Sequence, residues 1–261
     1  WRSEDFEGDN PPGGVRVFYY LDEAVPEDAE KPLLIEILDA EGRLVQRVHG
    51  AESSRERCLL INSDPRRPYE PRYPAARQGL NHWDWDATGR PFPCVENTTL
   101  FAGLHGPTAP AGRYTARVTA NGYSGEVSFE IEGDPRRGAS AEETTAWRAR
   151  IDETAGLLEG LLLNLRGLRN AAAQVAALLE RHPDEAALQE AGARALGAIE
   201  AWDHRVIQPL HQTLEDEDAW ATMLAGQLRY LLDVIDESGA PVTQGALDRL
   251  ADLRDQVEAL A

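Results

Sequence analysis

The chain changes character abruptly around Asp134-Pro135-Arg136-Arg137-Gly138, and this break constrains its fold more than any other feature. Segments with strand-like alternation and most of the 16 prolines precede it, whereas long Ala- and Leu-rich segments with a helical period follow it. Strands followed by helices favour two separately packed parts over a βαβ sheet. The sequence therefore predicts an α+β multidomain protein with domains at residues 1–137 and 138–261.

The first domain is predicted to hold several short antiparallel strands. Asn121-Gly122, between alternating segments at 113–119 and 126–131, predicts a two-residue hairpin because both positions accept a positive φ. A second hairpin is expected at 39–42. With further strands at 15–21 and 79–86, the pattern suggests an immunoglobulin- or fibronectin III-like β-sandwich.

Two segments of this domain carry expectations about burial. In the strand at 15–21, Phe18 and Tyr20 make both faces apolar, which is typical of a strand buried on both sides. The Pro-rich stretch 87–110 is irregular and long, so we expect it to be functional or packed on a neighbour.

The second domain is predicted to be an antiparallel four-helix bundle. The first helix is expected from Ala141 to Arg181, and Pro209 should kink or divide the second. Two further helices follow, separated by Ser238-Gly239-Ala240-Pro241. Because the first helix is about 60 Å long, its apolar stripe is longer than the last two helices can cover. We therefore expect the helical part to bury apolar surface against the sandwich or a partner chain.

Charge and hydropathy exclude two classes of partner. The formal net charge of −19 repels nucleic-acid phosphates and anionic lipid surfaces. The most apolar stretch, 157–165, is far shorter than the ~20 residues of a transmembrane helix. We expect no nucleic-acid partner and no membrane span.

The two cysteines, Cys58 and Cys94, lack the CxxC spacing of zinc or redox motifs. A Cys58–Cys94 disulfide and two buried free thiols both remain open.

Motifs for catalysis and cofactor binding are not found in the sequence. His204 and His211 lie seven residues apart in the second helical segment, where we interpret them as partly exposed side chains. Asp216 belongs to an acidic run without the glycine turn of a calcium loop, and we interpret that run as solvated. The prediction is no catalytic residue, no metal ligand and no cofactor in this chain.

One cluster has two interpretations. Trp83 and Trp85 share one face of the strand at 79–86, and Asp84 and Asp86 share the other. The tryptophans fit core anchors of the sandwich, since each buries a large apolar area. They also fit a sugar-stacking platform, with the aspartates as acceptors for sugar hydroxyls. The core interpretation is favoured because the alternation suits an inward face.

The order and spacing of several motifs resemble the C-terminal region of large secreted bacterial β-propeller proteins. That family has BNR or sortilin-like repeats, and many members are described as glycosyl hydrolases. Nearly the whole chain takes part in the resemblance. The motifs are Asn10-Pro11-Pro12-Gly13-Gly14-Val15, Phe18-Tyr19-Tyr20-Leu21, 35–45, Gly79-Leu80-Asn81-His82-Trp83-Asp84-Trp85-Asp86, 110–118, Asp134-Pro135-Arg136 and Pro241-Val242-Thr243-Gln244-Gly245.

The resemblance implies an extracytoplasmic location in a bacterium (periplasmic, cell-surface or secreted) and a β-propeller upstream. Trp1 in place of a methionine agrees with a piece of a longer protein. The hydrolytic residues of such a parent would lie in the propeller, so this fragment is expected not to be an enzyme by itself. We expect a non-catalytic interaction or assembly module that contacts the propeller of the same or another chain. The alternative is a carbohydrate-binding accessory module of a glycoside hydrolase, with a polysaccharide as the partner.

Overall fold

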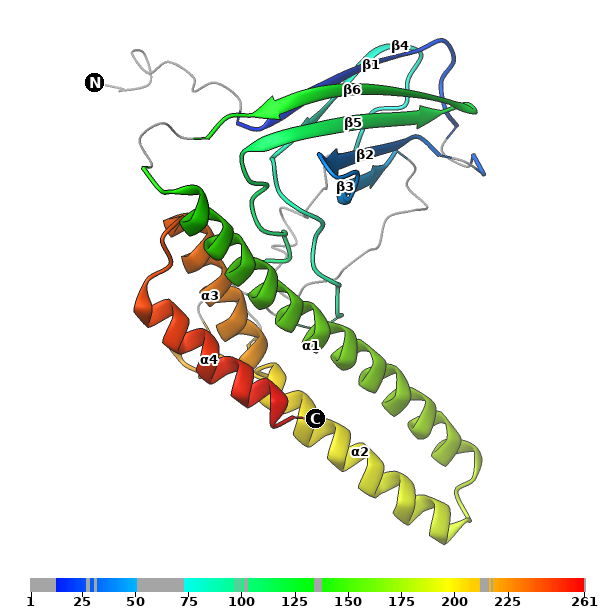
Figure 1. Ribbon diagram of the computed structural model, residues 1–261. Helices are drawn as coiled ribbons and strands as arrows, with labels where there is room; N and C mark the ends of the chain where they lie inside the picture. The colour runs from blue at the N-terminus through cyan, green and yellow to red at the C-terminus, as the bar shows by residue number, and fades with distance from the viewer. Residues whose placement is uncertain are drawn as a thin grey trace, which may run out of the picture. The chain divides into compact units, whose positions relative to one another are not determined.

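The computed structural model shows two antiparallel β-sheets and four α-helices (Figure 1). It describes residues 13–26, 29–30, 32–50, 73–96, 98, 100, 103–133, 138–211, 216 and 218–260. The predicted joint at 134–137 and Cys58 lie outside the described residues, so the Cys58–Cys94 disulfide stays a prediction.

The described residues form two compact units. The first holds the strands, in residues up to 50, 73–89 and 109–133, and the second holds the helices from residue 138 onward. The segment 90–108 belongs to the helical unit, although it lies between two strands in the sequence. A single division at residue 137 therefore misplaces this segment.

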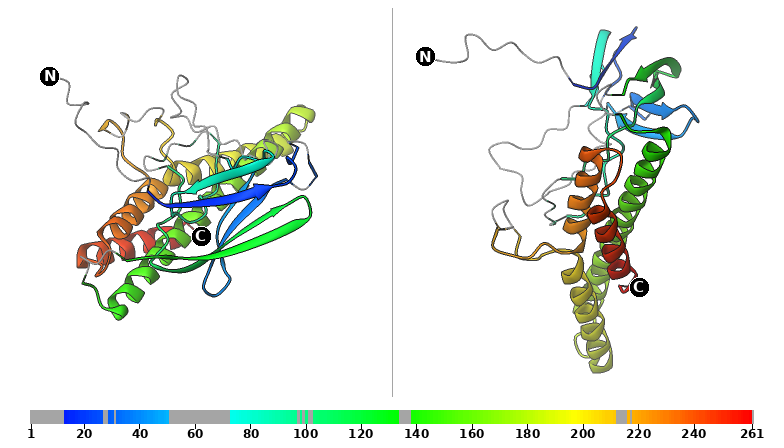
Figure 2. Two further views of the ribbon diagram at one scale, coloured as in Figure 1. Left: turned by 90° about the horizontal axis from the view of Figure 1, so that it is seen from above. Right: turned by 60° about the vertical axis from the view of Figure 1, so that its left-hand side comes forward.

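The strands of the first unit form a two-stranded and a four-stranded sheet. β1 (Val15–Leu21) pairs with β4 (Gly79–Trp85). The larger sheet has the order β3-β2-β5-β6 and is antiparallel throughout; its strands are β3 (Leu44–His49), β2 (Leu34–Asp39), β5 (Gly112–Ala120) and β6 (Tyr123–Ile131). Figure 2 shows β1 and β4 side by side, as a layer distinct from β5 and β6.

Both predicted hairpins are confirmed. Asn121 and Gly122 connect β5 to β6 with φ values of 51° and 83°. In the turn between β2 and β3, Gly42 has φ 77°, and a carboxylate oxygen of Asp39 accepts the backbone N–H groups of Glu41 and Arg43. These local interactions stabilise the turns independently of the rest of the fold.

The core of the first unit lies between its two sheets. Buried side chains from β1, β2, β4 and β5 meet there, and Trp85 contacts Tyr114 and Phe129 edge-on at centroid distances of 5.9 and 6.2 Å. Tyr19 donates a hydrogen bond from its hydroxyl to the carbonyl of Ala75 at 2.5 Å, and burial raises the pKa of Tyr19 to about 12. The described part of the first unit is thus an open, sandwich-like pair of sheets.

The helices of the second unit are α1 (Ala141–Arg181), α2 (Ala186–Val206), α3 (Leu224–Ser238) and α4 (Gln244–Glu258). The bounds predicted for the first helix are confirmed. α2 ends at Val206, three residues before Pro209, so Pro209 lies outside the helix that it was expected to kink or divide. Figures 1 and 2 show α1 and α2 continuing side by side past α3 and α4.

A capping box starts α1. Ser140 accepts the backbone N–H of Glu143 at 3.2 Å, and the Glu143 carboxylate accepts the backbone N–H of Ser140 at 2.8 Å. These reciprocal bonds satisfy two N–H groups that a helix terminus otherwise leaves without partners. The hydrogen bonds from Ser140 also lower the pKa of Glu143.

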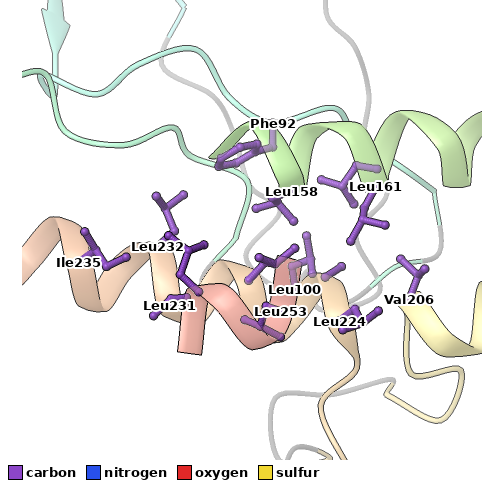
Figure 3. Close-up of a cluster of buried hydrophobic side chains, with 14 of the residues drawn as sticks. Phe92, Leu100, Leu158, Leu161, Val206, Leu224, Leu231, Leu232, Ile235 and Leu253 are labelled. Atoms are coloured by element: carbon purple, nitrogen blue, oxygen red, sulfur yellow. The ribbon is translucent and has the colours of Figure 1, made fainter. Parts of the chain in front are cut away.

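The segment 90–108 closes the core of the helical unit. The buried residues of α1 lie between Trp147 and Leu165, where α3, α4 and this segment meet it. Phe92, Val95 and Leu100 bring apolar side chains into that core, and Figure 3 shows Phe92 beside Leu158. The irregular connection is therefore packed against the helices. This confirms one of the two alternatives expected for the stretch 87–110, namely that it is packed on a neighbour.

Arg229 of α3 holds the same segment in place. Its side chain is buried, and its guanidinium donates hydrogen bonds to the carbonyl of Gly103 at 3.0 Å and to the Asp233 carboxylate. It also lies 2.8 Å from Nε2 of His105 and 5.9 Å from the centroid of the Phe92 ring. The guanidinium thus joins three points of the segment to α3.

We predict that Arg229→Ala destabilises the helical unit by about 3–5 kcal/mol, because it leaves buried acceptors and the Asp233 charge without their donor. Chemical denaturation followed by circular dichroism measures this change. The matched control is Arg194→Ala, which removes an exposed ion pair with Glu190 and should cost less than about 0.5 kcal/mol. Equal effects of the two substitutions would contradict the anchoring role.

Candidate interaction surface

The outward face of the β1–β4 sheet is built by the alternation of its two strands. In β1, Val17, Tyr19 and Leu21 point into the core, so Phe18 and Tyr20 point out. The register places Phe18 opposite His82 and Tyr20 opposite Leu80 of β4. Two apolar-rich rows therefore meet on one side of a paired sheet.

These four residues, Phe18, Tyr20, Leu80 and His82, form what we call the aromatic face. The exposed fractions of Phe18, Tyr20 and Leu80 are 61%, 67% and 73%. Phe18 and His82 lie with ring centroids 6.0 Å apart in a tilted arrangement. Large apolar side chains gathered on one exposed face are typical of an interaction site.

The expectation that both faces of this strand are buried was wrong. Arg16 lies on the same face of β1 as Phe18 and Tyr20, and an arginine is rarely fully buried. This residue was the signal in the sequence that could have identified the face as exposed.

An ion pair borders the aromatic face. The Arg16 guanidinium donates to both carboxylate oxygens of Asp84, from Nε at 2.6 Å and from Nη2 at 3.0 Å. The hydrogen bond and the charge of Asp84 raise the pKa of Arg16. Nε2 of His82 lies 4.0 Å from the same carboxylate. The face thus combines exposed rings with planar charged groups.

The cluster predicted from the sequence is divided between the two sides of the sheet. Trp83 and Trp85 are buried, with exposed fractions of 6% and 1%, and Nε1 of Trp85 donates to the Thr88 carbonyl at 2.8 Å. Neither indole offers a ring face to a sugar, and both occupy the position that the core interpretation expected.

Asp84 lies on the outward side, in the pair with Arg16. The Asp86 carboxylate accepts the backbone N–H and the hydroxyl of Thr88, at 3.1 and 2.7 Å.

The helical unit carries a groove of its own, about 590 Å³ in volume, between α1, Trp202 of α2 and the end of α4. Gly156, Gly160 and Gly167 leave room along α1, and Leu163 is 44% exposed beside them. Glu258 is the ionisable side chain in its lining. The groove offers mainly shape and apolar contact.

The remaining candidates are separate. His204 is exposed near the end of α2, whereas His211 is buried after it and has Nε2 3.2 Å from the carbonyl of Trp220. Within the described ranges, no three His, Cys, Asp or Glu side chains gather as ligands of a metal ion. None of the described helices has the length and apolar run of a bilayer-spanning helix.

Comparison with protein-family models, with curated proteins and with solved structures finds no match to this chain.

We predict that Trp85→Phe destabilises the strand unit by about 1–3 kcal/mol, because it removes buried volume and the indole donor to the Thr88 carbonyl, which retains the 3.5 Å contact from Nε2 of Gln46. The matched substitution Phe18→Thr acts on an exposed ring and should cost less than about 1 kcal/mol. Thermal unfolding of both variants tests the assignment of the two faces. A larger loss in Phe18→Thr would show that the outward face is covered.

Proposed function

We propose that this chain is a non-catalytic interaction and assembly module of a larger extracytoplasmic bacterial protein. The aromatic face is its docking surface, and the partner is the β-propeller that the resemblance implies. The observation that carries this proposal is the exposure of Phe18, Tyr20 and Leu80 on one face of a paired sheet. Docking would remove their apolar surface from water, which is the main favourable term in protein association.

The border of the aromatic face supports a protein partner. Interfaces combine an apolar centre with a polar rim, and aromatic residues and arginine are enriched in them. Phe18, Tyr20 and Leu80 supply such a centre, and the Arg16–Asp84 pair supplies part of a rim. With a net charge of −19, the chain should favour a partner surface that is neutral or basic around its apolar centre.

For the fold we propose the finer assignments of an immunoglobulin- or fibronectin III-like sandwich and an antiparallel helical bundle. The facing antiparallel sheets with a common core support the first. Packing of α1 against both α2 and α3 supports the second.

The test is calorimetric titration of this chain with the parent's β-propeller produced as a separate polypeptide. The triple variant Phe18→Thr, Tyr20→Thr, Leu80→Thr should weaken binding at least tenfold, because a few buried aromatic anchors carry most of the affinity of an interface. Val234→Gln replaces another exposed apolar side chain, on α3, and should leave binding unchanged. Unchanged binding by the triple variant would contradict the proposal.

The second candidate function is carbohydrate binding at the same face. Phe18 and Tyr20 are exposed rings beside the planar side chains of Arg16, His82 and Asp84. Exposed rings with adjacent hydrogen-bonding groups suit the apolar and polar sides of a sugar.

Affinity electrophoresis in gels containing xylan, hydroxyethyl cellulose or glycol chitin tests this candidate. Retardation that the triple variant loses would favour carbohydrate binding over protein docking. Substitutions of Trp83 are not used in this test, because its indole is buried in the core and its loss would destabilise the unit.

A further inference from the structure

The outer edge of β6 lies at one end of the four-stranded sheet and differs sharply from the opposite edge. β3, at the other end, is six residues long, contains a register irregularity between Leu44 and Gln46 in its pairing with β2, and carries Arg47. Bulges and basic side chains are devices that prevent edge strands from pairing with another chain. β6 is nine residues long, pairs with β5 without irregularity, and contains no proline or basic residue.

The side chains of β6 show that its inner face extends beyond the cover of the opposite sheet. Tyr123 and Val127 share a face with Tyr114 and Ala116, which are buried in the core. Tyr123 is nevertheless 82% exposed and Val127 57% exposed. The apolar side of β6 is therefore exposed at a sheet edge with which no other described strand pairs.

The hairpin defines which backbone groups face that edge. Ala120 and Tyr123 flank a two-residue turn, so they form a hydrogen-bonded pair, and such pairs alternate along the ladder. The intervening pairs bring side chains closer together, and three of them show side-chain contacts: Thr119–Ser124 at 3.1 Å, Arg117–Glu126 at 2.7 Å and Thr115–Ser128 at 3.4 Å. The N–H and C=O groups of Ser124, Glu126, Ser128 and Glu130 consequently point away from β5.

We propose that β6 pairs antiparallel with β6 of a second copy of this chain, around a two-fold axis at Val127. This surface and partner are separate from the docking proposed above. In this register Val127 lies opposite its own copy, Tyr123 lies opposite Ile131, and Gly125 lies opposite Phe129. Apolar side chains thus meet across the axis, and each aromatic ring of Phe129 covers a glycine, which is a known compensation for glycine in strands.

The outer face of the strand selects this register. A two-fold axis at Val127 places Glu126 opposite Ser128 and Ser124 opposite Glu130. An axis one residue earlier places Glu126 opposite its own copy, and an axis one residue later places Glu126 opposite Glu130. Like charges directly opposite destabilise a strand pair. All three registers make the edge-facing residues the hydrogen-bonded pairs, as the hairpin geometry requires, so the charges decide between them.

Cysteine cross-linking tests the register in the full-length chain. At the axis the two Cα atoms of residue 127 are expected about 4.5 Å apart, which a disulfide can span. Val127→Cys should therefore form a covalent dimer under mild oxidation. Tyr123→Cys is the matched control: it is more exposed, but its two copies lie some eight residues apart, roughly 27 Å. The wild-type chain, with Cys58 and Cys94, gives the background.

A charge test complements the cross-linking. Ser128→Lys places a lysine opposite Glu126 of the second copy twice per dimer and should tighten self-association roughly two- to tenfold, whereas Ser128→Glu should weaken it. Thr115→Lys adds the same charge one strand away from the edge and should change the affinity of self-association less. Sedimentation velocity across micromolar concentrations measures the shift from the 28.8 kDa monomer toward twice that mass.

Selective cross-linking of Val127→Cys with opposite effects of the two Ser128 variants supports the proposal. A wild-type chain that stays monomeric at the highest concentration overturns it, as does equal cross-linking of both cysteine variants. The two Ser128 substitutions also separate strand pairing from misfolding, because a folding defect would not tighten dimerisation with lysine and weaken it with glutamate. The triple variant of the aromatic face keeps β6 unchanged, so it should self-associate like the wild-type chain. Failure of propeller docking and failure of β6 pairing are therefore distinguishable.

Discussion

The apolar stripe of α1 imposes the main constraint on the helical unit. An amphipathic helix is stable only when its apolar face is removed from water, and α1 is 41 residues long whereas α3 and α4 have 15 residues each. The buried part, from Trp147 to Leu165, is covered by α3, α4 and the segment 90–108 together. A connection between two strands thereby becomes part of a helical core.

That solution requires polar groups to be satisfied inside an apolar region. The irregular backbone of the segment 90–108 has carbonyl groups without partners in a ladder, and Arg229 supplies donors for one of them. Arg169 of α1 makes a similar connection to the segment 90–108. Its guanidinium donates to both carboxylate oxygens of Asp203 of α2, at 2.6 and 2.8 Å, and to the Glu96 carbonyl at 2.7 Å. Two arginines therefore bind the segment to different helices.

The strand unit is constrained instead by the unequal number of strands in its two sheets. A two-stranded layer cannot cover the full inner face of a four-stranded one, so apolar residues of β6 remain exposed. The smaller layer in turn exposes its outward rings, since the described part of the unit packs nothing over them. Both proposed interfaces arise from this inequality, one at a sheet edge and one on a sheet face.

Local features of this chain could be read from its sequence. The bounds of α1, the end of α2 before Pro209 and the turns at Asn121-Gly122 and 39–42 depend on neighbouring residues, through hydrogen-bond geometry and backbone φ preferences. The alternation of Trp83 and Trp85 with aspartates likewise indicated an inward face for the tryptophans. For the candidate surface, the sequence indicated Asp84 but assigned Phe18 and Tyr20 to the interior.

Only the tertiary structure decided what covers each apolar face. Phe18 and Phe92 are both aromatic residues in the strand-rich half of the sequence, yet one is 61% exposed and the other 8%. Their difference depends on the number of strands in each sheet and on the path of the segment 90–108 across the helices. Burial is a property of residues distant in sequence that meet in space, whereas periodicity reports only the residues along one element. The sequence by itself therefore determined where most helices, strands and turns lie, and the packing within each unit decided which surfaces remain exposed.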